Sequence, residues 1–231
     1  ALGRHGETIA RGFDALGWSW WPADAAVATT PYGEGREACN YGSSCDLGCA
    51  TGARAGSDLA YWPSAIRAGV VLKTRARVRE LVIGNDDRVQ SAVYYQDGRI
   101  HEQRARLIIV ACNGVGTPRL LLNSRSHRFP EGLANRSGLV GKNLMFHPAA
   151  FVTGYFEEPL QSNHGPVSNS VYSHHFYETD QSRGFVRGYQ FQVTRDSGPL
   201  WAAKGGTSGE RIPWGADHHR VFRERFNHSL N

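Results

Sequence analysis

The feature that most constrains this chain is an apolar run followed at once by glycines. Residues 105–112 read Ala-Arg-Leu-Ile-Ile-Val-Ala-Cys, a pattern that predicts a strand buried on both faces. Residues 113–116 read Asn-Gly-Val-Gly and predict a tight turn. Thr117 and Pro118 then predict a helix start, with Thr117 as N-cap and Pro118 in the first turn. Such an element presents backbone N–H groups to an anion such as pyrophosphate, although an ordinary strand–helix turn has the same pattern.

A small antiparallel sheet is predicted just before this run. Strand-like segments are separated by two turns, Asn-Asp-Asp at 85–87 and Gln-Asp-Gly at 96–98, which is typical of hairpins. The predicted strands cover residues 70–72, 78–83, 89–95 and 100–104.

The remaining chain predicts a mixture of helices, strands and loops. Residues 5–16 fit an amphipathic helix that ends at Gly17, and residues 57–68 fit a helix whose apolar side chains face a core. Further strands are predicted at 151–156 and 185–194, and a loop at 202–218. We therefore expect an α+β fold.

The charge balance restricts the classes of partner. The chain has 231 residues, a formal net charge of +5 and a pI near 9.2. Only three of its 26 basic residues are lysines, and acidic residues lie between the arginines. This dispersed pattern does not favour a nucleic-acid partner. No run approaches the roughly 20 apolar residues of a membrane helix, so no transmembrane segment is predicted.

Three of the four cysteines lie in one glycine-rich segment. Cys39, Cys45 and Cys49 could ligate an iron–sulfur cluster, because thiolates are soft ligands that suit iron, and three of them would suit a three-iron cluster. They could also bind zinc with a fourth ligand. Reduced thiols packed in a loop, or one disulfide with a spare thiol, fit the same spacing.

The ten histidines give no clear catalytic group. The pairs His174-His175 and His218-His219 make poor joint ligands, because adjacent side chains point in different directions. His147 is a candidate for a structural or pocket role. The sequence has no nucleophile elbow, Walker loop or zincin motif, so the catalytic residues remain unknown.

Four ordered segments resemble the middle of bacterial glucose–methanol–choline (GMC) oxidoreductases. The first is Cys45-Asp-Leu-Gly-Cys49 with Gly52-Ala-Arg54. The second combines Tyr61-Trp-Pro, Gly69-Val and Arg77-Val78. The third runs from Ala111 to Ser124 and the fourth from Gly132 to Pro148. Together they cover residues 1–160 well and the rest more weakly.

The resemblance implies FAD and the oxidation of an alcohol or sugar. It places Val78 on the strand that meets the adenine, and Asn113, Gly114, Thr117 and Pro118 on the turn near the dinucleotide. Family members commonly have Gly-Ala where this chain has Asn113-Gly114. The cysteine spacing resembles a sugar-dehydrogenase branch with a 3Fe-4S cluster on the positions of Cys39, Cys45 and Cys49, but cluster-free relatives have similar loops.

The resemblance also implies a domain plan. Residues 65–145 would be an α/β part of the FAD-binding domain, residues 1–38 and 146–231 parts of a substrate-binding domain with an antiparallel sheet, and residues 39–64 a cysteine-rich loop and helix between them. The family's Gly-x-Gly-x-x-Gly motif and its carboxyl-terminal catalytic histidine are not found in this chain, which predicts an internal fragment that is inactive alone.

The partners expected are a small alcohol or sugar, the remaining segments of the parent chain, or an electron-acceptor subunit. Resemblance to bacterial enzymes points to the cytoplasm or the periplasm without choosing between them. A different class of function is also open, namely a non-catalytic electron-transfer or binding module organised by the cysteine loop.

Overall fold

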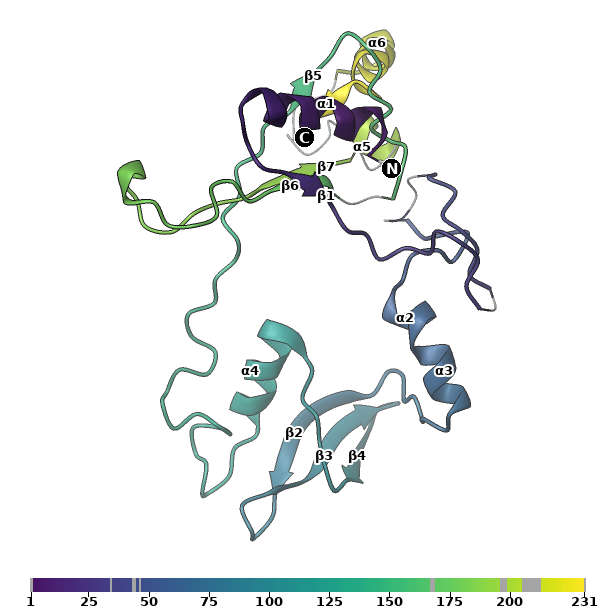
Figure 1. The fold of residues 1–231 in the computed structure, drawn as a ribbon. Coiled ribbons are helices and arrows are strands. Elements are labelled where there is room, and N and C mark those ends of the chain that lie inside the picture. Colours follow the sequence, from purple (N-terminus) through teal and green to yellow (C-terminus); the bar gives the residue numbers. More distant parts are fainter. Residues whose placement is uncertain are drawn as a thin grey trace. The chain divides into compact units, whose positions relative to one another are not determined.

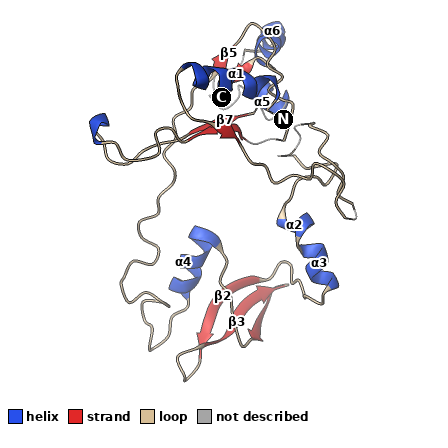
Figure 2. Cartoon of the chain, in the orientation of Figure 1, coloured by secondary structure: helices blue, strands red, loops and turns tan. Residues whose placement is uncertain are grey.

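The computed structural model describes residues 2–33, 35–42, 45, 47–166, 169–195, 199–204 and 213–230. They divide into two compact units. Unit 1 combines Ala1–Ala68 with Ala149–Asn231, and unit 2 is Gly69–Pro148. Both units contain helices and strands (Figure 2), and every ladder between the named strands is antiparallel. The chain therefore has the mixed α+β composition that the sequence predicts.

Unit 2 contains a three-stranded meander in the order β2-β3-β4. The strands are β2 (Arg77–Ile83), β3 (Val89–Gln96) and β4 (Arg99–Arg104), as the sequence predicts to within a residue or two. The two predicted turns connect them, and both use left-handed backbone, with φ of 62° at Asp87, 49° at Asp97 and 75° at Gly98. Asp and Gly tolerate this conformation better than branched residues do.

Helix α4 (Asn113–Asn123) packs on β2, as Figure 1 shows. Leu81 of β2, Leu120 of α4 and Leu133 form the buried core of the unit. At the end of α4, the Ser124 hydroxyl accepts a hydrogen bond from the Leu81 N–H at 2.8 Å and donates one to the Leu120 carbonyl at 2.7 Å. One buried hydroxyl thus satisfies a strand donor and a helix acceptor.

Two predicted strands of unit 2 are not strands in the structure. Residues 70–72 and 107–112 lie in no ladder, and Val71, Leu107 and Ile109 are about four-fifths exposed. The physical reason is the lack of a neighbour, because the described residues offer no further strand beside either segment. Burial on both faces, predicted for 105–112, is therefore wrong for this structure.

The predicted start of the helix at Thr117 is also wrong. Helix α4 begins at Asn113, with Cys112 as N-cap, and includes Pro118 in its second turn. Asn113 takes a φ of 54° at the point where the chain enters the helix. The predicted turn at 113–116 is therefore part of the helix. Pro118 has no N–H to donate to the Gly114 carbonyl four residues earlier, and its ring crowds that carbonyl, so the helix includes it at a cost.

Unit 1 is built around a second three-stranded sheet. Its order is β1 (Trp21–Pro22), β6 (Asn169–Ser173) and β7 (Phe191–Thr194). Helix α1 (Gly3–Ala15) lies beside β6 (Figure 1). Phe13 of α1 packs with Val171 and Val193. Helix α1 agrees with the predicted helix over 5–16, and Gly17 follows it with a φ of 69°, the left-handed ending that glycine favours.

A buried polar cluster joins α1 to the sheet of unit 1. His5 is 1% exposed, and its Nδ1 lies 3.1 Å from the Ser170 hydroxyl on β6. The buried Arg195, just after β7, donates to the carbonyls of Leu2 at 3.0 Å and His164 at 2.9 Å. Burial, and next the nearby charge of Arg195, lower the pKa of His5 to about 4.

The other elements of unit 1 are short. The predicted helix over 57–68 is split into α2 (Ser57–Ala60) and α3 (Trp62–Arg67) around Tyr61, and Leu59, Trp62 and Ile66 are exposed rather than in a core. The predicted strands at 151–156 and 185–194 shorten to β5 and β7. The remaining elements are β5 (Gly154–Tyr155), the 3-10 helix η1 (Gln181–Arg183), α5 (Pro199–Ala203), α6 (Ala216–Arg225) and β8 (Ser229–Leu230).

The loop predicted at 202–218 has a mixed outcome. Residues 205–212 lie outside the described residues, whereas residues 202–203 and 216–218 belong to α5 and α6. Among the helices that the structure describes, none combines the length and the apolar character needed to cross a membrane.

Replacing Ser124 by alanine is expected to loosen unit 2. The change leaves the Leu81 N–H without its partner, and an unsatisfied buried donor costs about 1–3 kcal/mol. Hydrogen exchange of the β2 amides should accelerate roughly 5- to 100-fold. Ser137→Ala, at an exposed serine of the same unit, is the matched control and should leave these rates nearly unchanged. Equal exchange in the two variants would contradict the role assigned to Ser124.

Unit 1 is expected to lose stability as the pH falls from 6.5 to 4. The pKa of His5 is about 4 in the folded chain against an ordinary value of 6.5, so the unfolded chain binds more protons in this range. The resulting stabilisation is complete above pH 6.5, is lost toward pH 4, and amounts to about 3 kcal/mol.

Urea unfolding followed by tryptophan fluorescence tests this expectation, because all six tryptophans belong to unit 1. His5→Gln should flatten the dependence of unfolding free energy on pH between 6.5 and 4. The exposed His127→Gln is the control and should keep it. A wild-type unfolding free energy that does not change with pH between 6.5 and 4 would contradict the lowered pKa of His5.

Candidate functional site

The first candidate site is the amino-terminal turn of α4. The first four N–H groups of a helix have no intrahelical acceptor. Here Asn113 satisfies one of them, because its Oδ1 accepts a hydrogen bond from the Val115 N–H at 3.1 Å. Asparagine can do this because its short side chain reaches the backbone two residues ahead. The side chain therefore shapes the turn, while other N–H groups of the turn remain available to a ligand.

Glycines keep this turn accessible. A Cβ atom placed on Gly114 would meet nothing within 4 Å, whereas one on Gly116 would come within 2.9 Å of the Cys112 Cβ. Gly116 therefore permits the close winding of the turn, and Gly114 leaves backbone open to solvent. Exposed N–H groups at a helix start, together with the helix dipole, suit a phosphate or carboxylate. The residues present thus fit a phosphate-bearing cofactor such as FAD.

The structure separates the predicted cofactor residues into two groups. Asn113, Gly114, Thr117 and Pro118 all belong to the first two turns of α4, and the last two are half-buried there. Val78 lies on β2, opposite Tyr94, and is 43% exposed. No hydrogen bond among the described residues joins Val78 to these α4 residues, so their shared role in cofactor binding stays a prediction.

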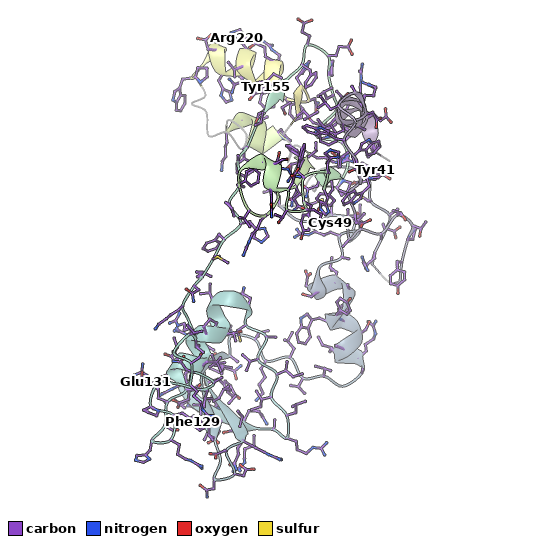
Figure 3. The ribbon with its side chains drawn as sticks, turned by 60° about the vertical axis from the view of Figure 1, so that its left-hand side comes forward. Tyr41, Cys49, Phe129, Glu131, Tyr155 and Arg220 are labelled. Carbon is purple, nitrogen blue, oxygen red and sulfur yellow. The ribbon has the colours of Figure 1, made fainter. Side chains whose placement is uncertain are left out.

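The second candidate site is the cysteine loop of unit 1, where Cys49 lies (Figure 3). The Cys39 N–H donates to the Ala28 carbonyl at 2.9 Å, and the Cys45 carbonyl accepts from the Arg54 guanidinium at 2.6 Å. The Cys49 sulfur accepts from the Arg54 N–H at 3.4 Å. Arg54 therefore holds the second half of the loop through both its side chain and its backbone.

Arg36 also stabilises the loop through hydrogen bonds to its backbone. Its guanidinium donates to the carbonyls of Gly52 and Ala53, both at 3.1 Å. Ala53 is completely buried, and Gly52 has a φ of 63° with the Gly35 carbonyl so close that a Cβ would lie 2.5 Å from it. These contacts were not predicted from the sequence, in which Arg36 is one of many dispersed arginines.

The thiols of the loop do not form a metal site in this structure. All four cysteines of the chain are free thiols, and Cys39, Cys45 and Cys49 are each partly exposed. Among the described ranges, no group of three or more His, Cys, Asp or Glu side chains is placed to hold a metal ion. The expected three-cysteine ligand set for a 3Fe-4S cluster is therefore not brought together.

Hydrogen bonding changes the acidity of one thiol. The backbone N–H of Arg54, followed by the Thr51 hydroxyl 3.5 Å from the sulfur, lowers the pKa of Cys49. Both groups favour the thiolate because they donate to it. The lowered pKa of Cys49 therefore comes from hydrogen bonds within the loop.

A cavity of about 190 Å³ lies next to the loop. It has a carboxylate, a guanidinium and a thiol in its wall, among small apolar side chains. Its volume is below the roughly 300 Å³ at which ligand pockets usually begin, so it suits a small polar molecule rather than a dinucleotide. The lining residues are Asp24, Ala25, Ala26, Val27, Cys45, Arg54, Ala55 and Pro166.

The predicted pocket role of His147 has no support in the geometry. His147 is exposed, as are Met145 and Phe146 before it. It lies in the last residues of unit 2, and no hydrogen bond or ring contact involving it is found among the described residues. No catalytic base can be named from these contacts.

Several known proteins resemble this chain, one of them over nearly its whole length. 2-Methyl-1,2-propanediol dehydrogenase of Mycolicibacterium austroafricanum is 38% identical over 231 residues, which cover 99% of this chain and 42% of that enzyme. Paromamine 6'-oxidase of Streptomyces fradiae is 32% identical, covering 79% of this chain and 35% of that protein. The large subunit of fructose dehydrogenase of Gluconobacter japonicus is 33% identical, covering 67% and 28% respectively. The chain thus spans about two fifths or less of these relatives.

A family model described as GMC oxidoreductase matches residues 11–149. This range is more than half of the chain and contains both the cysteine loop and the amino-terminal turn of α4. The four ordered motifs and the agreement with named relatives point to the same assignment. The chain belongs to the GMC oxidoreductase family.

Proposed function

We propose that the parent polypeptide is an FAD-dependent oxidoreductase that oxidises a CH–OH group of a sugar, polyol or other alcohol. The observation that carries this proposal is the open amino-terminal turn of α4 in a chain of this family. Its exposed backbone at Gly114 can approach a pyrophosphate closely, because no side chain intervenes. Residues that serve only to cap a helix would not require glycine at this position.

The relatives support the class of substrate. Their names record a diol, paromamine and fructose as substrates, and they include both dehydrogenases and oxidases. We extend to this chain only the common element, a hydroxyl-bearing small molecule that loses two electrons. These electrons then pass either to an electron-acceptor subunit or to oxygen.

FAD, when bound, supplies the two-electron acceptor for this oxidation. The chain's own contribution is to hold the cofactor. In the proposal, the N–H groups at the start of α4 bind phosphate oxygens, Asn113 fixes the shape of the turn, and Thr117 and Pro118 set the direction of the helix behind it. Val78 would contact the adenine from β2. Catalytic proton transfer is assigned to no residue of this chain.

The domain plan is proposed on the same basis. Residues 65–145 would contribute to the FAD-binding domain, residues 1–38 and 146–231 to the substrate-binding domain, and residues 39–64 would connect them. The alternative is a non-catalytic electron-transfer or binding module organised by an iron–sulfur or thiol cysteine loop, and the arrangement of the described thiols does not favour an iron–sulfur cluster.

The proposal is tested on the parent polypeptide expressed from its whole reading frame. It should purify with a yellow flavin whose visible absorption bleaches without oxygen when a diol or sugar is added. Return of the absorption on admitting air indicates an oxidase, and return only with an artificial acceptor indicates a dehydrogenase. A parent that folds but neither retains nor binds added FAD would refute the proposal.

Gly114→Asp in the parent should weaken FAD binding at least about tenfold. A carboxylate at this position would repel phosphate, whereas at a helix start it stabilises the helix itself. Lost binding with unchanged thermal stability is therefore the expected result, measured by flavin fluorescence titration and calorimetry. Gly114→Ala, which adds a methyl group but no charge, is the matched comparison and should weaken FAD binding less than Gly114→Asp does. Unchanged affinity for FAD in Gly114→Asp would show that the pyrophosphate does not bind at this turn.

A further inference from the structure

Asn113 and Gly114, at the start of α4, form the one Asn-Gly pair in the sequence. Asparagine is a thermolabile residue, because the peptide nitrogen of the next residue can attack its side-chain carbonyl carbon and expel ammonia. The attack needs an unbonded N–H after the asparagine, room around that nitrogen, a side-chain amide that other groups do not hold, and access for water. The first turn of α4 meets all of these conditions.

The peptide nitrogen of Gly114 is accessible. Its N–H is among the first four of the helix, which have no intrahelical acceptor, and no other hydrogen bond of this group is found among the described residues. Gly114 carries no Cβ, and one placed there would meet nothing within 4 Å, so no side chain shields the nitrogen. Asn113 and Gly114 are both exposed, which gives water access to the product of the attack.

The Asn113 side chain is folded back toward the peptide nitrogen that would attack it. Its Oδ1 accepts a hydrogen bond from the Val115 N–H at 3.1 Å, which bends the side chain over the intervening Gly114 peptide. The same hydrogen bond draws electrons toward the oxygen and makes the Asn113 Cγ a better electrophile. The leaving group is not held, because the hydrogen bonds of Asn113 to described residues involve its Oδ1 and not its Nδ2.

Two other asparagines of unit 2 show the contrast. Asn123 lies at the other end of the same helix, and the N–H of the following Ser124 donates to the Leu120 carbonyl at 3.1 Å. That peptide nitrogen is therefore already engaged. Asn135 is held by its leaving group, because its Nδ2 donates to the Glu131 carbonyl at 2.9 Å. In both cases a hydrogen bond of the fold opposes the reaction, whereas at the first turn of α4 the fold favours it.

We propose that Asn113 is a self-modification site, at which the chain deamidates without an enzyme. The Gly114 nitrogen loses its proton and bonds to the Asn113 Cγ, the Cγ–Nδ2 bond breaks, and Nδ2 leaves with that proton as ammonia. Water then opens the cyclic imide at either of its carbonyls and gives aspartate or isoaspartate. The net reaction consumes one water and releases one ammonia, with no change of oxidation state.

The product changes the charge of the turn to which the proposed function assigns the pyrophosphate, and this consequence rests on that function. A carboxylate at residue 113 adds a negative charge beside the N–H groups that would bind phosphate. Bound FAD would in turn engage these N–H groups and slow the attack. Parent molecules without FAD would therefore age into a form that binds FAD poorly, whereas molecules already loaded with FAD would be preserved.

Peptide mapping by mass spectrometry tests the site on the parent polypeptide after removal of its flavin. In mildly alkaline buffer, Asn113 should be converted to aspartate and isoaspartate at least about tenfold faster than Asn123, because the Gly114 nitrogen is unshielded. A synthetic peptide of residues 110–117 gives the rate without the fold. Conversion at Asn113 that is no faster than at Asn123, or more than about tenfold slower than in the peptide, would mean that the fold protects Asn113 and would overturn the proposal. If flavin removal unfolds the parent, the loaded parent is incubated for longer, and its Asn113 must still react faster than Asn123.

Matched variants of the parent identify the reacting groups. Gly114→Ala places a methyl group beside the attacking nitrogen and should slow conversion at Asn113 at least about tenfold. Asn113→Gln keeps the amide but must close a larger ring, so residue 113 should stay unmodified. Asn123→Gln is the control and should leave conversion at Asn113 unchanged. Undiminished conversion in Gly114→Ala would contradict attack by the Gly114 nitrogen.

Added FAD separates this inference from the proposed function. If both hold, saturating FAD should slow conversion at Asn113 at least about tenfold, and Asn113→Asp, which has the charge of the aspartate product, should bind FAD at least about fivefold more weakly. Conversion at Asn113 that is equal with and without FAD would refute the protection and the pyrophosphate site, while the mass change would still establish the deamidation. A parent that oxidises its alcohol with FAD but keeps Asn113 intact when the flavin is removed would refute the deamidation and leave the proposed function standing.

Discussion

In unit 2, the strands that hydrogen-bond to one another are those joined by a short turn. The meander β2-β3-β4 is fully local, since each strand follows its partner after a short turn. The Ser124 hydroxyl joins the end of α4 to β2, because it accepts from the Leu81 N–H and donates to the Leu120 carbonyl. The side chains of Leu81, Leu120 and Leu133 form the core of the unit. Segments 69–72 and 106–111 pair with no strand among the described residues and stay outside the sheet. Local pairing therefore decides how much of this unit becomes ordered sheet.

Sequence reasoning predicted the meander well because its signals are local. Asp87, Asp97 and Gly98 take left-handed backbone at the two turns, and each turn joins strands that pair directly with each other. The predicted strand at 105–112 could not be judged in this way, since burial on both faces depends on neighbours far along the chain or outside it. The start of α4 was misplaced for another reason. Pro118 is a strong start signal, but Asn113 already initiates the helix four residues before Thr117.

The candidate sites were predictable in position but less so in contacts. The motif at 113–118 identified the exposed helix start, and the three cysteines identified a structured loop. The bonds that shape this loop come from Arg36 and Arg54, and nothing in their spacing distinguishes them from the other arginines. The comparison with known proteins assigned the family, whereas the geometry shows that thiol spacing alone does not assemble a metal site.

Arg195 has a consequence for the order in which the chain can fold. Its guanidinium reaches the carbonyls of Leu2 and His164, and β1 pairs with β6, so unit 1 is assembled from both halves of the chain while unit 2 is inserted between them. On the ribosome, the meander and α4 can form as soon as they emerge. Helix α1 and β1 must wait for the sheet they pack on until residues 169–195 have been synthesised. The insertion makes unit 1 a domain of high contact order, whose folding is set by the closure of a long loop.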